Sequence, residues 1–262
     1  MGPCQARRRK VVNEQDILTA VKDFLGVSGS PVVGISPASR LPSVPVDFSP
    51  QHILHPARNV ICYGLPIPRG ILHAENHSLA LYWRYCNMVY RALDTCANRL
   101  CLFLEEQGLV ASPIYGCFPW KVVGREFWGL LPLVYWAEQA GLGRLAKCGL
   151  LAHPKHGTRL LLGGLITSLE LEATGELAEV PCPPACTECV DACPVEAIGS
   201  TGKVNHNACL RYSGANPLLV HLLEDRAVKE KFSFETCLNT VGVDDHGSYT
   251  CNQCLKVCPL NH

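Results

Sequence analysis

Two cysteine blocks in the last third of the chain constrain its fold more than any other feature. The first block runs from Cys182 to Cys193 and the second from Cys251 to Cys258. Each block ends in two cysteines that are separated by three residues and followed by a proline, and a single Cys209 lies between the blocks. Tight turns that present several thiols in this way are typical of chains that bind an inorganic centre.

The spacing predicts two 4Fe–4S clusters. Bacterial-type ferredoxins bind such clusters with C-x2-C-x2-C-x3-C-P runs, in which the fourth cysteine serves the other cluster. Applied to this chain, the crossed arrangement assigns four cysteines to each cluster. The first set is Cys182, Cys186, Cys189 and Cys258, and the second set is Cys193, Cys209, Cys251 and Cys254.

Two departures from the ferredoxin run leave alternatives open. Three residues instead of two separate Cys182 from Cys186, and the second block lacks a third local cysteine, so that Cys209 or Cys237 must supply it. The alternatives to clusters are two zinc sites or a disulfide framework. The repeated C-x3-C-P ending favours clusters over zinc, and disulfides require an oxidising compartment.

Composition indicates a globular chain. Its 262 residues are 48% hydrophobic and carry a formal net charge of zero, so no basic surplus for nucleic acid is evident. No signal peptide and no apolar run of about 18 residues is present, so we expect a cytoplasmic protein without a membrane span. Seven cysteines outside the blocks are predicted to be small buried residues in a reducing compartment. They are Cys4, Cys62, Cys86, Cys96, Cys101, Cys117 and Cys148.

Hydrophobic periodicity predicts a mixed helix and strand region ahead of the blocks. Helical spacing predicts helices over residues 14–25, 79–107 and 127–140, the first with Asn13 as its N-cap. Apolar runs predict strands over 31–35, 60–65, 110–115 and 160–171, the last broken at Gly163 and Gly164. This alternation indicates an α/β or α+β layer.

The segment from Ala140 to Leu171 resembles epoxyqueuosine reductases. The likeness rests on Ala140-Gly141-Leu142-Gly143, Lys147, Gly149-Leu150-Leu151, Pro154, Gly157 and the strand from Leu165 to Leu171, with His55-Pro56 further upstream. Related sequence occurs in the catalytic part of reductive dehalogenases. The resemblance covers residues 55–262 and implies an α+β fold. In that fold, a nitroreductase-like, cobalamin-binding domain (1–175) precedes a bacterial ferredoxin-like domain with two 4Fe–4S clusters (176–262).

The resemblance also implies a loop that faces the corrin, made of Gly141, Gly143, Lys147, Gly149 and Gly157. Several residues depart from the family pattern. The position of the family aspartate that donates a proton is taken here by Phe127. The adjacent Glu126 could serve instead, but adjacent residues on a helix face about 100° apart. Other replacements are Ala146 for Gly, Cys148 for Asn, His156 for Tyr and Ser168 for Asp. The family's C-terminal helical repeats, which help to hold tRNA, do not follow His262, so we expect tRNA not to be a partner.

These features predict a cobalamin-dependent reductase that acts on a small-molecule or nucleoside substrate. The two clusters would pass single electrons to cobalt, and a nearby acid would protonate the product. Candidate acids are Glu126, Tyr115, His153 and His156. Four aromatic residues either line a substrate pocket or pack in the core. They are Trp120, Trp128, Tyr135 and Trp136.

The main alternative is a ferredoxin-type electron carrier without a substrate of its own, which would reduce a partner such as a corrinoid protein. A third possibility is a structural or redox-sensing cluster protein. The first two hypotheses require an external electron donor of the ferredoxin or flavodoxin type.

Overall fold

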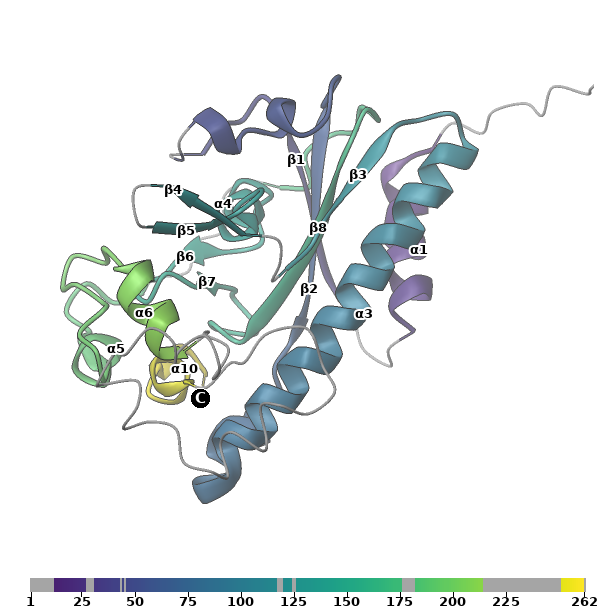
Figure 1. Cartoon of the computed structure of the whole chain (residues 1–262). Helices are drawn as coiled ribbons and strands as arrows, with labels where there is room; N and C mark the ends of the chain where they lie inside the picture. Colours follow the sequence, from purple (N-terminus) through teal and green to yellow (C-terminus); the bar gives the residue numbers. More distant parts are fainter. Residues whose placement is uncertain are drawn as a thin grey trace, which may run out of the picture.

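The computed structural model describes residues 12–26, 31–42, 44, 46–116, 120–123, 126–175, 182–213 and 251–261. At its centre is a four-stranded sheet with the order β1-β2-β8-β3, in which each neighbouring pair is antiparallel (Figure 1). The strands are β1 (Val32–Pro37), β2 (Asn59–Pro66), β3 (Ala111–Ile114) and β8 (Leu160–Thr167). The two central strands, β2 and β8, are buried almost throughout, which explains why both are continuous apolar runs in the sequence.

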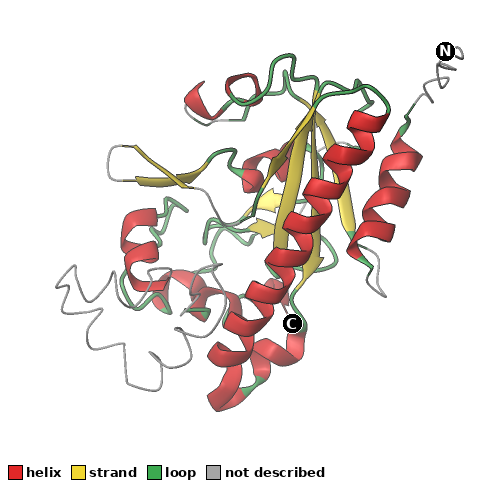
Figure 2. Cartoon of the chain, turned by 45° about the vertical axis from the view of Figure 1, so that its right-hand side comes forward, coloured by secondary structure: helices red, strands yellow, loops and turns green. Residues whose placement is uncertain are grey.

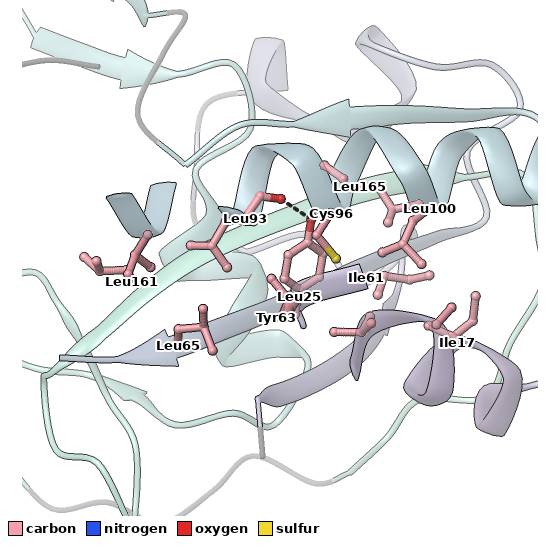
Figure 3. Packing of buried hydrophobic residues seen from close by; sticks show 14 of the residues in the cluster. Ile17, Leu25, Ile61, Tyr63, Leu65, Leu93, Cys96, Leu100, Leu161 and Leu165 are labelled. Carbon is pink, nitrogen blue, oxygen red and sulfur yellow. Dashed lines mark hydrogen bonds between the residues drawn. The ribbon is translucent and has the colours of Figure 1, made fainter. Parts of the chain in front are cut away.

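One face of the sheet is covered by α1 (Glu14–Leu25) and the long helix α3 (Ser78–Glu106), which lie beside each other (Figure 2). Helix α1 begins at Asn13, whose side chain accepts the backbone N–H of Asp16 while the Asp16 carboxylate accepts that of Asn13. Between α3 and the sheet, the Tyr63 hydroxyl donates a hydrogen bond of 2.9 Å to the Leu93 carbonyl (Figure 3). Apolar side chains from both helices and from β2 and β8 form this core.

The other face packs against α4 (Leu133–Gln139), centred on the buried Trp136, and lies beside the short pair β6 (Arg144–Leu145) and β7 (Leu151–Ala152). Beyond β6 and β7 lie the helices of the cysteine blocks, α5 (Glu188–Asp191), α6 (His206–Ser213) and α10 (Gln253–Lys256) (Figure 1). The other elements within the described residues are the hairpin β4 (Trp120–Val123) and β5 (Glu126–Gly129), the helix α2 (Arg69–His73) and four 3-10 turns. These turns are η1 (Val46–Phe48), η2 (Pro50–His52), η3 (Glu75–His77) and η4 (Pro259–Asn261).

The predicted α+β class is confirmed, and the elements predicted around residues 14–25, 60–65, 79–107 and 110–115 are present. The predicted helix over 127–140 is wrong in its first half. Glu126–Gly129 is a strand, and Pro132 marks the start of the helix, because proline fits only the first turn. The predicted boundary between residues 175 and 176 borders a segment outside the described residues and stays a prediction, as does the nitroreductase-like label.

Strand β8 is not broken at its two glycines, contrary to our expectation. A Cβ at Gly163 would lie 3.0 Å from Leu93 of α3, and one at Gly164 would lie 2.8 Å from the side chain of Leu133 in α4. The two glycines therefore let a helix approach each face of a continuous strand, which ends at Thr167 rather than at residue 171. None of the described helices is long and apolar enough to cross a membrane.

Candidate metal centre

The four cysteines of the first set converge on one cavity. Three come from the first block and its helix α5, whereas Cys258 arrives from the second block, 69 residues after Cys189 by the numbering. Backbone and side chains of the β6–β7 turn close the cavity together with Cys148. The lining residues are Ala146, Lys147, Cys148, Cys182, Pro183, Cys186, Cys189, Cys258, Pro259 and Leu260. The arrangement is the one that crossed ligation by two cysteine blocks requires.

The four thiols at this cavity are the donor set that a 4Fe–4S cluster requires. The cavity's first-set donors are all thiols, and those four cysteines are not joined in disulfides. A structural zinc ion needs four ligands at about 2.0–2.3 Å from one point. Among the described residues, no group of three or more His, Cys, Asp or Glu side chains is arranged to hold a single metal ion. A cluster instead spreads its four ligands around a larger body, which suits thiols that share a cavity.

The second set is positioned by α6, α10 and the turn after α5. Cys193 and Cys251 both lie close to the Tyr212 hydroxyl, whose pKa is raised by burial and then by these two thiols. The Cys193 sulfur accepts the Ala197 N–H at 3.2 Å, a contact of the kind that tunes cluster ligands. Cys209 lies on α6 one turn before Tyr212. The alternative ligand Cys237 lies outside the described residues.

Lys147 ties the β6–β7 turn to the first cysteine block. Its Nζ donates to three backbone carbonyls, at 3.2 Å to Pro183, 2.5 Å to Pro184 and 2.8 Å to Cys186. Charge-assisted hydrogen bonds of this kind are stronger than neutral ones. In the structure the ammonium group holds the turn between the first two cysteines of the first set, and the prediction that Lys147 contacts a corrin stays a prediction.

The glycines predicted to face a corrin contact the chain itself. A Cβ at Gly143 would lie 2.2 Å from the Ala152 carbonyl, and one at Gly157 would lie 2.2 Å from the Leu260 carbonyl. Gly157 also has a positive φ of 58°, which other residues rarely adopt. At Gly149 the nearest atom is a methyl group of Val204. Gly141 ends α4 with a φ of 76° and donates its N–H to the Glu138 carbonyl.

The predicted close approach is thus present, but at Gly143, Gly149 and Gly157 its partner is protein. These glycines therefore let the loop pack closely against itself and against the cysteine-block segment. Their part in binding a corrin stays a prediction.

Two buried asparagines fasten the second cysteine block to the sheet domain. Asn252 donates from Nδ2 to the Ser78 hydroxyl at the start of α3, at 2.9 Å. Asn261 accepts the Thr158 N–H at 2.8 Å and donates to the Thr158 hydroxyl and the Leu255 carbonyl at 2.9 and 2.8 Å. These contacts hold both ends of the segment that carries Cys258. No sequence motif pointed to them.

The candidate acids are not assembled at the cavity in the described residues. The Tyr115 hydroxyl donates to Asn98 Oδ1 on α3 at 3.0 Å. The His153 and His156 rings stack at 4.9 Å. Burial lowers the pKa of His153 to about 4, helped by His156 and Lys155, and burial also lowers the pKa of His156. Both imidazoles are therefore neutral near pH 7 and carry no proton to donate as imidazolium.

Glu126 pairs through its backbone with Val123 in the β4–β5 hairpin, but its side chain lies outside the described part. Its role as an acid stays a prediction.

The aromatic residues divide between core and hairpin. Trp136 lies on α4 and is fully buried in the core, and its Nε1 has no hydrogen-bond partner among the described residues. Trp128 of β5 lies 5.3 Å from Phe48, 6.5 Å from Tyr135 and 6.3 Å from His206, measured between ring centroids. Trp128 therefore links the hairpin to α6, which lies between the two cysteine blocks in the sequence. The side chain of Trp120 lies outside the description.

The sequence analysis did not predict that Cys148 lines the cavity of the first set. The residue is buried, as predicted, yet it lines the cavity of the first set. Its position directly after Lys147, in place of the family asparagine, was the available signal.

Comparisons with known proteins agree with this geometry. Residues 182–261 match the 4Fe-4S double cluster binding domain family. Over 215 residues the chain is 33% identical to an epoxyqueuosine reductase of a Synechocystis species. This match covers 80% of this chain and 65% of the relative. A second epoxyqueuosine reductase, from a Synechococcus strain, is 35% identical over 66% of this chain and 45% of its own length. The chain resembles epoxyqueuosine reductases in sequence.

Solved structures show the same fold. Epoxyqueuosine reductase from Streptococcus thermophilus superposes with a TM-score of 0.60 at 20% identity, over 95% of this chain and 66% of that one. A catabolic reductive dehalogenase gives a TM-score of 0.63 at 14% identity, over 99% of this chain and 33% of its own. The chain spans between about a third and about two thirds of the length of these relatives. The predicted resemblance and the two-cluster domain are confirmed.

Proposed function

We propose that this chain is an iron–sulfur oxidoreductase of the epoxyqueuosine reductase type. Its two 4Fe–4S clusters carry electrons, one at a time, towards a cobalamin that serves a small-molecule or nucleoside substrate. The observation that carries the proposal is the convergence of Cys182, Cys186 and Cys189 with Cys258 around one cavity. A two-cluster domain of this kind is built for one-electron transfer.

In this proposal the residues of the chain hold and tune the clusters. The first set binds one cluster next to the β6–β7 turn, and the second set binds the other between α6 and α10. Lys147 brings a positive charge and three hydrogen bonds to the turn that carries Cys186. Cobalamin, when bound, supplies a cobalt centre that accepts single electrons and reacts with the substrate. The support for cobalamin is the sequence likeness and a fold match to a reductive dehalogenase whose structure suggests a mechanism for B12-dependent dehalogenation.

A second candidate function is electron transfer to a partner redox protein, without a substrate of this chain's own. The packing of Gly143, Gly149 and Gly157 supports it, because the close approaches of these glycines are explained by contacts within the protein. The pairing of the Tyr115 hydroxyl with Asn98 points the same way. Both functions require an external electron donor of the ferredoxin or flavodoxin type, and both suit a cytoplasmic protein.

The expectation that tRNA is not a partner loses support. One structure with the same fold is an epoxyqueuosine reductase with an epoxyqueuosine-modified tRNA stem loop, and it covers 95% of this chain with a TM-score of 0.56. Because this part of the fold is present in a tRNA-bound enzyme, we include a modified tRNA stem loop among the candidate substrates to be tested.

The deciding experiment uses anaerobically purified protein with both clusters loaded. Cob(II)alamin is added, and its electron paramagnetic resonance spectrum is compared with that of the same cofactor in buffer. A spectrum shifted to the base-off form, with cobalt reduced further once the clusters are reduced, supports the reductase. An unchanged spectrum over intact and reducible clusters refutes cobalamin binding and leaves the electron carrier. Cluster-free protein is the control for nonspecific binding.

A further inference from the structure

Arg159 carries a positive charge at the end of the sheet where β2 finishes and β8 begins. It directly precedes β8, and only 6% of its surface is exposed. Its Nη1 donates a hydrogen bond to the carbonyl of Ile67, the residue directly after β2, and its own carbonyl accepts the Ile67 N–H at 2.7 Å. Because arginine stays protonated in proteins, this buried charge is permanent.

The fork of the Arg159 guanidinium group has no partner in the described part of the chain. In a guanidinium group the Nε–H and one N–H of Nη2 point the same way, and together they can bind an oxyanion through two parallel hydrogen bonds. Nε is shielded from solvent and has no hydrogen-bond partner, and the guanidinium group donates to no described residue except Ile67, through Nη1. Its one partner is therefore a neutral carbonyl.

A buried charge with a free fork favours the binding of an anion. Transfer of a charged group from water into a protein is strongly unfavourable unless a counter-charge and hydrogen bonds compensate for it. The neighbouring charge has the same sign, since burial lowers the pKa of Arg159 and Arg69 lowers it further. Arg69 is exposed at the start of α2, two residues after Ile67. Two guanidinium groups near each other are suited to a phosphate or a carboxylate.

The fork lies beside the junction between the sheet domain and the second cysteine block. Thr158, the residue before Arg159, accepts and donates hydrogen bonds with Asn261, and Gly157 packs against Leu260. Helix α2, which Arg69 begins, is in contact with α10. An anion at Arg159 would therefore bind next to the contacts that hold the two parts of the chain together.

We propose that Arg159, assisted by Arg69, forms a binding site for the phosphate or carboxylate group of a small molecule. The Nε–H and Nη2–H groups of Arg159 bind two oxygens of the anion, and the exposed Arg69 adds a second positive charge. The site uses none of the predicted cluster ligands, so the proposal depends neither on the clusters nor on cobalamin.

The test uses the full chain with its clusters loaded under anaerobic conditions. Thermal unfolding is followed by circular dichroism at increasing concentrations of inorganic phosphate or of acetate, and chloride at the same ionic strength is the reference. An anion that binds only the folded state raises the unfolding midpoint, and the dependence on concentration gives its affinity. We expect phosphate, acetate or both to raise the wild-type midpoint above that in chloride. The more effective anion identifies the class of group.

The deciding variant is Arg159→Lys, which keeps a positive charge but lacks the fork. It should bind the effective anion roughly tenfold to a hundredfold more weakly, the loss expected when hydrogen bonds between charged groups are removed. Arg58→Lys is the matched control. Arg58 directly precedes the other central strand, β2, and its N–H donates to the Thr167 carbonyl at the opposite end of β8 at 2.8 Å. This variant should keep the wild-type affinity.

Two results would overturn the proposal. The first is a wild-type midpoint that neither phosphate nor acetate raises above its value in chloride. The second is an equal affinity in the wild type and in Arg159→Lys. Should Arg159→Lys not fold, Arg69→Gln decides, because its side chain is exposed and an unchanged affinity there would refute the paired site. Failure of the cobalamin experiment would leave this proposal intact.

Discussion

Asn261 offers the sharpest test of how the second cysteine block is attached to the sheet domain. It follows Cys258 by three residues, is 2% exposed, and joins the Thr158 N–H and the Leu255 carbonyl through one side chain. Asn261→Ala removes both contacts and leaves these two buried backbone groups without that partner. Each buried group without a hydrogen bond costs about 1–3 kcal/mol. We therefore expect this segment to be destabilised by about 4 kcal/mol.

Hydrogen–deuterium exchange measured by mass spectrometry reports this change locally. Because every 1.4 kcal/mol or so is a factor of ten in an equilibrium constant, a cost of about 4 kcal/mol raises the opening of residues 251–261 roughly a thousandfold. Cys251, Cys254 and Cys258 all open with that segment, so a chelator should remove iron from both clusters faster than in the wild type.

The matched control is Asn98→Ala, which removes an asparagine exposed on α3 that accepts the Tyr115 hydroxyl. Surface substitutions of this kind usually change stability by about 0.5 kcal/mol or less. An increase of less than about fivefold in exchange over 251–261 for Asn261→Ala would be below the cost of even one unsatisfied buried group. The attachment would then depend on packing and not on these hydrogen bonds.

Three further predictions concern the cluster turn and its surroundings. Lys147→Met keeps the apolar stem but loses three hydrogen bonds. A chelator should therefore remove the first cluster from Lys147→Met faster than from Lys147→Arg. Equal rates would refute the role of the positive charge. Cys182→Ser should lower the iron content from about eight to about four atoms per chain, and an unchanged count would remove Cys182 from the ligands. Because folding lowers the pKa of His153 to about 4 and also lowers that of His156, the folded state binds fewer protons than the unfolded state below the ordinary histidine pKa of about 6.5. The free energy of unfolding should therefore fall as the pH drops from about 6.5 towards about 4. Urea unfolding at several pH values would detect this fall. The same pH dependence in His153→Gln would contradict the role of His153.

Local features of the sequence predicted much of the fold. Asn13 caps α1 as expected, since a capping side chain bonds within its own first turn. The 3.6-residue repeat predicted the long helix α3, and continuous apolar runs predicted the buried strands β2 and β8. The prediction ahead of Pro132 was wrong, because an apolar, aromatic stretch is compatible with a short strand as well as with a helix when only its composition is considered.

The candidate site divides in the same way. Cysteine spacing predicted which thiols meet, because a cluster demands a fixed number of sulfur ligands on tight turns, and the structure gathers the first set around one cavity. The partners of Gly143, Gly157 and Lys147 were not predictable. A glycine indicates that another group approaches closely, and a lysine indicates a positive charge. Neither residue type predicts which group lies beside it.

The sequence by itself therefore determined the local elements and the chemistry of the two cysteine sets, since capping, periodicity and ligand spacing act over a few residues. Only the tertiary structure decided that Cys148 lines the cavity of the first set, and that Asn261 fastens the second block through Thr158. Those contacts join residues that are far apart along the chain. They depend on how β7, α5 and α10 pack against one another, which no short stretch of sequence encodes.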